Sequence, residues 1–280
     1  ISVAPPLEKA GPADAPVAVP GAGGMAPAAA DAVVILPYDD EAAVERIVAA
    51  HAGELACIML DPKAGVMPQR PEFVRAVEAT ARRHGLILLC DEIVGFRVGT
   101  GGIQEQFGIR PDLSTYGKIV GGGFPVGAFG GRRDIMNLTD NSEGPARVFQ
   151  SGTHSGHALV MAAGRATLEQ LTQEAFAHVN GLTERLCAGV EKELERAGIP
   201  GVALRDGSVF SIYFTAEQPR CYRSLARIDK ELNAPVFLSL LNQGYFLSHN
   251  IGMNAVSLPT QAADIDGFVE AFGRALAEAG

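Results

Sequence analysis

The sequence predicts an α/β fold followed by a smaller α+β domain. Between Asp39 and Asp91, segments with helical periodicity alternate with short apolar segments, which is typical of parallel strands connected by helices. After about residue 173, a long amphipathic segment is followed by short strands and further helices. With 280 residues, of which 47% are hydrophobic and 20% charged, the chain can bury one large core or two smaller ones.

Three ranges follow from these patterns. Residues 1–37 are rich in alanine, proline and glycine, and the frequent prolines exclude a long helix or a central strand, so we expect an extended segment. Residues 38–172 are expected to form the larger, mostly parallel domain. Residues 173–280 are expected to form the α+β domain.

Local signals place the elements of the larger domain. Asp39 or Asp40 caps a helix that runs to about His51, and residues 55–60 are expected to form a fully buried strand. Pro71 begins the next helix, which ends at His84 and Gly85. Residues 86–90 form a second buried strand, which ends at Asp91. Such strands are expected to pair in parallel through right-handed connections.

The second half of the chain gives weaker signals. An amphipathic pattern extends from Gly156 to about Ala197, with an expected break near residues 171–174. Beyond it we expect strands at residues 202–205 and 208–215, followed by a helix at 229–242. A further strand at 244–248 and a final helix from Asp264 onward complete this half.

Composition excludes several classes of partner. The net charge is -9 and the isoelectric point about 5.2, without a basic stripe, so neither nucleic acid nor an anionic membrane surface is an expected partner. No apolar run is long enough to span a membrane. The four cysteines lie far apart and lack metal-binding spacing, which favours free thiols, a cytoplasmic location and no metal site. We expect Cys57 and Cys90 to lie in buried strands.

Lys118 and Asp91 are the first candidate site residues. Asp91 ends an apolar strand, and Lys118 lies in an apolar setting directly before a glycine-rich turn. Pyridoxal phosphate needs both groups, because a lysine amine forms a Schiff base with its aldehyde and a carboxylate keeps its pyridine nitrogen protonated. Lys118 is the only lysine between Lys63 and Lys192. By residue type alone, a surface lysine and a helix-capping aspartate remain an equally good interpretation.

A longer pattern extends this interpretation. The run DEIVGFRVGTGG, continued by FGIRPDLSTYGKIVGGGFPVGAFGGRRDIM, resembles the core of the class III pyridoxal-phosphate aminotransferases, and most of all the branch that contains glutamate-1-semialdehyde aminomutase. The resemblance continues through residues 151–171 and covers most of the chain after Tyr38. It implies fold type I, pyridoxal 5'-phosphate as cofactor, and transfer of an amino group from an amino acid or amine to a keto acid or aldehyde through a Lys118 aldimine.

The resemblance also implies further site residues. Ile93 would pack on one face of the cofactor ring, although a core isoleucine is the alternative. Ser151, Gly152 and Thr153 precede a helix, which is a geometry that binds phosphate but also that of a simple helix cap. By resemblance, Gly152 and Thr153 would contact the phosphate of a neighbouring subunit's cofactor. The active enzyme would then be a homodimer with a shared site.

The sequence departs from the family in three places. A long upstream segment of the family, which carries a second phosphate-binding loop, is absent from this sequence. Val66 stands where an asparagine would bond the cofactor's phenolic oxygen, and Gly252 stands near the position of an aminomutase glutamate. Gly252 favours amino transfer over isomerisation. An aminomutase or racemase, and a non-catalytic fragment or pseudo-enzyme subunit, remain the alternatives, as does loss of activity in so short a chain.

Overall fold

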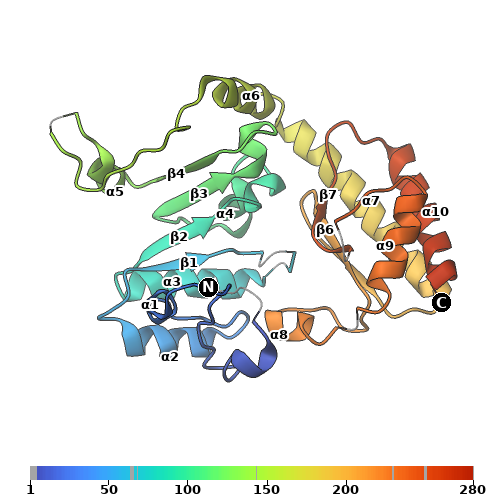
Figure 1. Cartoon of the computed structure of the whole chain (residues 1–280), viewed down its shortest axis with the longest axis horizontal. Helices are drawn as coiled ribbons and strands as arrows, with labels where there is room; N and C mark the ends of the chain where they lie inside the picture. The colour runs from blue at the N-terminus through green and yellow to red at the C-terminus, as the bar shows by residue number, and fades with distance from the viewer. Residues whose placement is uncertain are drawn as a thin grey trace.

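A computed structural model describes residues 5–63, 66–67, 69–142, 144–228, 230–248 and 251–279. Figure 1 shows a four-stranded sheet with its helices on one side of the molecule, and a three-stranded sheet with long helices on the other. The expected order of an α/β part followed by an α+β part is therefore what the chain forms.

The larger sheet has the strand order β1-β2-β3-β4. Its strands are β1 (Cys57–Leu60), β2 (Ile87–Asp91), β3 (Leu113–Gly117) and β4 (Gly127–Gly131). The first three are parallel, as expected, and β4 is antiparallel to β3. Asp91 is thus the last residue of a strand whose parallel neighbours all end at the same edge of the sheet.

Helices cover one face of this sheet. They are α2 (Glu41–His51), α3 (Pro71–Arg83) and α4 (Gly102–Phe107), with the short 3-10 turn η2 (Gly95–Val98) before α4. Asp40 caps α2 by accepting a hydrogen bond from Ala43 N at 2.9 Å, and Pro71 occupies the first turn of α3, both as predicted. Val44, Val74 and Leu88 lie in the core between these helices and the sheet.

The opposite face is open at β1, which corrects the expectation of a fully buried strand. Exposed and buried residues alternate along β1, and Met59 is 63% exposed. Cys57, which we expected to be buried, is exposed on the same face, whereas Cys90 is buried. The apolar residues of β1 allow burial on both faces of the sheet, but each face is buried only where another layer packs over it.

Beyond β3 the chain forms smaller elements that lead to the second half. They are η3 (Lys118–Gly121), α5 (Arg133–Met136), η4 (Asn137–Thr139) and α6 (Ala158–Leu168). Helix α6 packs directly on η3: a Cβ at Gly164 of α6 would overlap the Val120 carbonyl oxygen. The absence of a side chain at Gly164 is what allows this close approach.

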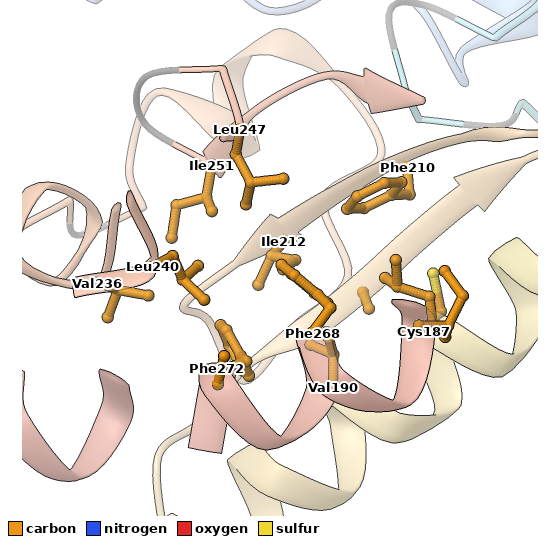
Figure 2. Packing of buried hydrophobic residues seen from close by; sticks show 14 of the residues in the cluster. Cys187, Val190, Phe210, Ile212, Val236, Leu240, Leu247, Ile251, Phe268 and Phe272 are labelled. Atoms are coloured by element: carbon orange, nitrogen blue, oxygen red, sulfur yellow. The ribbon is translucent and has the colours of Figure 1, made fainter. Parts of the chain in front are cut away.

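The second half packs helices on a small antiparallel sheet of order β5-β6-β7. Its elements are α7 (Gln173–Ala197), β5 (Val202–Asp206), β6 (Val209–Tyr213), α8 (Tyr222–Leu225), α9 (Asn233–Asn242), β7 (Asn254–Ala255) and α10 (Ala262–Ala279). Figure 2 shows Val190 of α7, Phe272 of α10 and Ile212 of β6 pointing into one shared core. The break expected near residues 171–174 is present between α6 and α7.

Two expectations for this half are wrong. Residues 245–248 are not a strand; instead, Asn254 and Ala255 pair with β6. Leu247 still contributes to the core, so its apolar character reflects burial rather than strand pairing. The helix expected from residue 229 begins only at Asn233.

The N-terminal segment is mostly extended but has two short helical turns, η1 (Leu7–Lys9) and α1 (Pro27–Asp31). Side chains from both halves hold it in place. Arg223 Nη2 donates to the carbonyl oxygens of Ala10, Gly11 and Pro12, and Arg46 of α2 pairs with Asp14 at 3.1 Å. The start of the chain therefore lies against α8 and α2, as Figure 1 shows.

Candidate functional site

The candidate site lies where β2 and β3 end. Asp91 and Thr115 are paired by strand register, and Lys118 follows the last residue of β3. Ligand sites of open α/β sheets lie outside the carboxyl ends of the strands. The structure thus brings Asp91 and the start of the Lys118 turn to one edge of the sheet, on neighbouring strands.

Asp91 is held by one of its two carboxylate oxygens. Oδ1 accepts from Ile93 N at 3.0 Å and from Thr115 Oγ1 at 3.3 Å. In the parts of the chain that the structure describes, Oδ2 accepts no hydrogen bond. Asp91 is therefore an oriented carboxylate with one oxygen available to an additional donor, and it caps no helix.

Lys118 begins η3 with a backbone φ of +52°, in the left-handed region. This conformation costs a non-glycine residue about 1–2 kcal/mol and is found most often at functional sites. The packing of α6 on η3 stabilises the turn. The Lys118 side chain is exposed in this structure although its neighbours in the sequence are apolar, because the nearby sheet face is open.

Ile93 lies beside the lysine turn. A Cβ added at Gly117 would lie 3.5 Å from Ile93 Cγ2, so Ile93 packs over the residue that precedes Lys118. Ile93 also lines an open, mostly apolar pocket of about 360 Å³ together with Leu89, Thr115 and Phe129. The pocket has a volume typical of small-molecule sites. It offers an apolar wall close to both candidate site residues.

Gly152 and Thr153 lie elsewhere. Both are exposed in the segment before α6, and no hydrogen bond connects either residue to Asp91, Ile93 or Lys118 within the described ranges. Val148 and Phe149, immediately upstream, are 50% and 86% exposed. In a single chain, these residues therefore do not complete the site formed by Asp91 and Lys118.

The sequence analysis did not single out Glu92, which fixes the segment after β2. It is fully buried and accepts hydrogen bonds from Ile103 N and Gln104 N, both at 2.9 Å, and from Gln104 Nε2 at 3.1 Å. Burial raises the pKa of Glu92, and these hydrogen bonds oppose that shift. A side-chain cap placed ten residues before its helix leaves no local sequence signal.

Lys63 was also missed, although it lies close to the site. It is 1% exposed in the turn after β1, with Nζ 3.9 Å from Asp61 Oδ2. Tyr38 donates to Asp61 O at 3.0 Å and so fixes the start of that turn. The signal available was the lysine itself, inside an otherwise apolar segment.

Arg97 connects the two halves of the chain. Its Nε donates to Ser208 Oγ at 3.2 Å and its Nη2 to Val256 O at 3.0 Å. Burial lowers the pKa of Arg97. The arginine thus holds the β5–β6 turn against η2, and its side-chain hydrogen-bond partners among the described residues are Ser208 and Val256.

Val66 and Met67 belong to the same contact between halves. They are buried in a small apolar cluster with Leu204 and Val209, from β5 and β6. A valine is well suited to this cluster, which accounts for its presence where the resemblance suggested an asparagine.

Comparison with known proteins decides the family. The sequence model of the class III aminotransferases matches residues 19–276. The chain belongs to the class III aminotransferases. Among curated relatives in this family, the glutamate-1-semialdehyde 2,1-aminomutase of Citrifermentans bemidjiense is 38% identical over 249 residues, which are 86% of this chain and 57% of that protein. The same-named protein of Rhodopirellula baltica is 36% identical, over 86% of this chain and 55% of its own length.

Solved structures of an omega-transaminase and an aminomutase share the fold. The omega-transaminase from Sphaerobacter thermophilus superposes with a TM-score of 0.90 at 35% identity, covering 94% of this chain and 61% of its own. A glutamate-1-semialdehyde-aminomutase from Pseudomonas aeruginosa PAO1 gives a TM-score of 0.78 at 27% identity, covering 87% of this chain and 56% of its own. The chain therefore spans somewhat more than half the length of these relatives.

The described residues contain neither a membrane-spanning helix nor a metal-binding group of side chains. Among the described residues, no helix combines the length and apolar character needed to cross a bilayer. Within the same ranges, histidine, cysteine and carboxylate side chains form no group able to hold a metal ion.

Proposed function

We propose that this chain carries the lysine-bearing part of a pyridoxal-phosphate-dependent aminotransferase that moves an amino group between an amino acid or amine and a keto acid or aldehyde. The observation that supports it is the placement of Lys118 and Asp91 at the ends of adjacent parallel strands in a class III chain. A solved structure of this fold is described as a transaminase with pyridoxal phosphate bound.

The residues present fit this cofactor. Asp91 Oδ2 is available to accept a hydrogen bond from a protonated ring nitrogen, because Thr115 and Ile93 N occupy only Oδ1. Ile93 and the pocket beside it provide an apolar surface for a flat ring. The Lys118 amine is exposed and able to reach an aldehyde. When bound, the cofactor supplies the electron-accepting ring that stabilises a carbanion at the amino-bearing carbon.

Each residue then has a distinct task. The Lys118 amine would hold the cofactor and, when free, would accept and return the proton at the substrate carbon. Asp91 would fix the orientation of the ring through Oδ2. Lys118 has a positive φ and begins η3, which packs against α6, so the backbone that carries the amine is held in place.

We further propose that two copies share the site, with Gly152 and Thr153 facing the phosphate in the partner's pocket. Three features support this: both residues are exposed, they precede helix α6, and Val148 and Phe149 beside them expose apolar surface. Light scattering should give twice the mass of one chain, and Thr153→Val should weaken pyridoxal phosphate binding. A monomer that binds the cofactor normally would contradict the shared site.

Isomerisation is the second candidate, because the curated relatives compared above are named as aminomutases. Transfer without change of the substrate skeleton is favoured because Gly252 provides no acid or base. A product assay separates them: isomerisation proceeds without a keto acid or aldehyde acceptor, and transfer stops when the acceptor is withheld.

The deciding experiment is to add pyridoxal phosphate to the purified chain, reduce with borohydride and locate the adduct by peptide mass spectrometry. We expect one adduct per chain, on Lys118. Lys118→Ala should abolish it, and Lys192→Ala, which removes an exposed lysine of α7, should not. Scattered labelling of surface lysines would contradict the proposed role of Lys118, and would favour a non-catalytic chain.

A further inference from the structure

Lys63 is a charged residue buried at the meeting point of the two halves. It lies in the turn between β1 and α3, and only 1% of its surface is exposed. Its backbone N–H donates to Asp61 Oδ1 at 3.2 Å, and its Nζ lies 3.9 Å from Asp61 Oδ2. Met67 N donates back to Lys63 O at 2.8 Å. The turn is thus organised around the lysine at both its backbone and its ammonium.

Asp206 belongs to β5, and Leu204 of the same strand packs against Met67 of the turn that carries Lys63. Asp206 ends β5, is 5% exposed, and accepts from Gln106 Nε2 of α4 at 2.9 Å through Oδ1. Its Oδ2 is buried and has no hydrogen-bond partner in the described part of the chain. A buried carboxylate with an unpaired oxygen is costly unless a cation lies near it.

The charges around Lys63 identify that cation. Burial lowers the pKa of Lys63; Asp61 and Asp206 raise it, Lys118 lowers it, and Asp91 raises it. Burial raises the pKa of Asp206, and Gln106 and Lys63 oppose this shift. Leu60 of β1 pairs with Cys90 of β2, so the turn after β1 lies beside Asp91 at the sheet edge where β3 also ends. Of the two lysines at this edge, Lys63 is buried and Lys118 is exposed.

We propose that Lys63 is a positioning residue of the Lys118 site, whose buried ammonium holds the turn after β1 against β5 by facing Asp61 and Asp206 together. The apolar contact of Val66 and Met67 with Leu204 lies in the same turn and joins the same two elements. Lys63 is not a second Schiff-base lysine, because its amine is not accessible. Neither is it a substrate-anion site, because carboxylates of the protein already surround it.

The role matters most when Lys118 is bound to the cofactor, so this part of the inference rests on the proposed function. The Lys118 amine is then joined to the cofactor, and among the described residues Lys63 remains the buried lysine beside Asp61. Lys63 thereby opposes the rise in the pKa of Asp206 that burial causes, and it keeps the two halves in register.

The test is a double-mutant cycle with Lys63→Met and Asp206→Asn, read by urea unfolding. We expect Lys63→Met to lower the unfolding midpoint, because it leaves Asp206 buried and uncompensated, and the added Asp206→Asn to restore much of the loss. Lys63→Arg should retain most of the midpoint, and Lys192→Met should leave it unchanged. Additive effects of the two substitutions would overturn the proposal, whether or not pyridoxal phosphate binds.

A second readout separates positioning from stability alone. In borohydride trapping at Lys118, Lys63→Met should need about tenfold more pyridoxal phosphate for the same yield, because the turn beside Asp91 is displaced. Lys63→Arg should restore the yield at the wild-type concentration. A wild-type chain that labels while Lys63→Met labels identically would refute the positioning role. A wild-type chain that never labels would instead count against the proposed function, and the unfolding cycle would decide on Lys63.

Discussion

Two glycine-to-alanine substitutions in helices should have opposite effects on stability. Gly181 lies on an exposed part of α7, where an added Cβ meets no atom within 4 Å. Gly164 lies in α6, where the same Cβ would overlap the Val120 carbonyl oxygen. Alanine stabilises a helix interior by about 0.5–1 kcal/mol relative to glycine. Gly181→Ala should therefore raise the free energy of unfolding by that amount.

At Gly164 the same helical gain is outweighed. The Val120 oxygen belongs to backbone and cannot rotate away, so α6 and η3 must separate, and such overpacking costs about 1–3 kcal/mol. We expect a net loss of up to about 2 kcal/mol in urea unfolding, and weaker trapping of pyridoxal phosphate, because η3 carries Lys118. Equal shifts of the same sign in the two variants would refute the reasoning that α6 braces the lysine turn.

Three further substitutions test buried carboxylates. Glu92→Gln should lower the free energy of unfolding by about 1–3 kcal/mol at neutral pH, because an amide NH₂ would face the backbone donors Ile103 N and Gln104 N. An unchanged urea midpoint would show that Glu92 does not cap α4. Burial raises the pKa of Asp112, but the hydrogen bonds from Leu88 N and Arg132 outweigh burial, so the pKa is lowered overall. The stability advantage of wild type over Asp112→Asn should therefore be complete above about pH 4 and become smaller as the pH falls. The pKa of Asp206 is raised by burial, so the advantage over Asp206→Asn should be greatest in acid and decline as pH rises; parallel pH profiles for the two aspartates would contradict these assignments.

Local rules accounted for the elements that position the site. A capping carboxylate at Asp40, a proline at the first turn of α3 and an apolar run before Asp91 each act within a few residues, and each predicted element is present. These local rules did not identify Lys118 as a site residue, because a lysine before glycines is found on ordinary surface turns as well as in cofactor sites. The long family pattern supplied what residue types alone left open.

What the sequence could not show depends on tertiary contacts. The exposure of Met59 and Lys118 depends on whether another layer covers their sheet face. Strand β7 is two residues long and is defined only by pairing with β6. The packing of Met67, in the Lys63 turn, against Leu204 joins residues far apart in the chain, and no periodicity within one segment encodes such a contact.

The contacts of Arg223 with Ala10, Gly11 and Pro12 have a consequence for the order of folding. They join residues that are 211–213 positions apart, so they form only after the elements between them have reached their places. They are also few and lie near the surface, and such contacts open at little cost in free energy. In hydrogen exchange, the N-terminal segment should therefore be the last to gain protection during refolding and the first to lose it under native conditions.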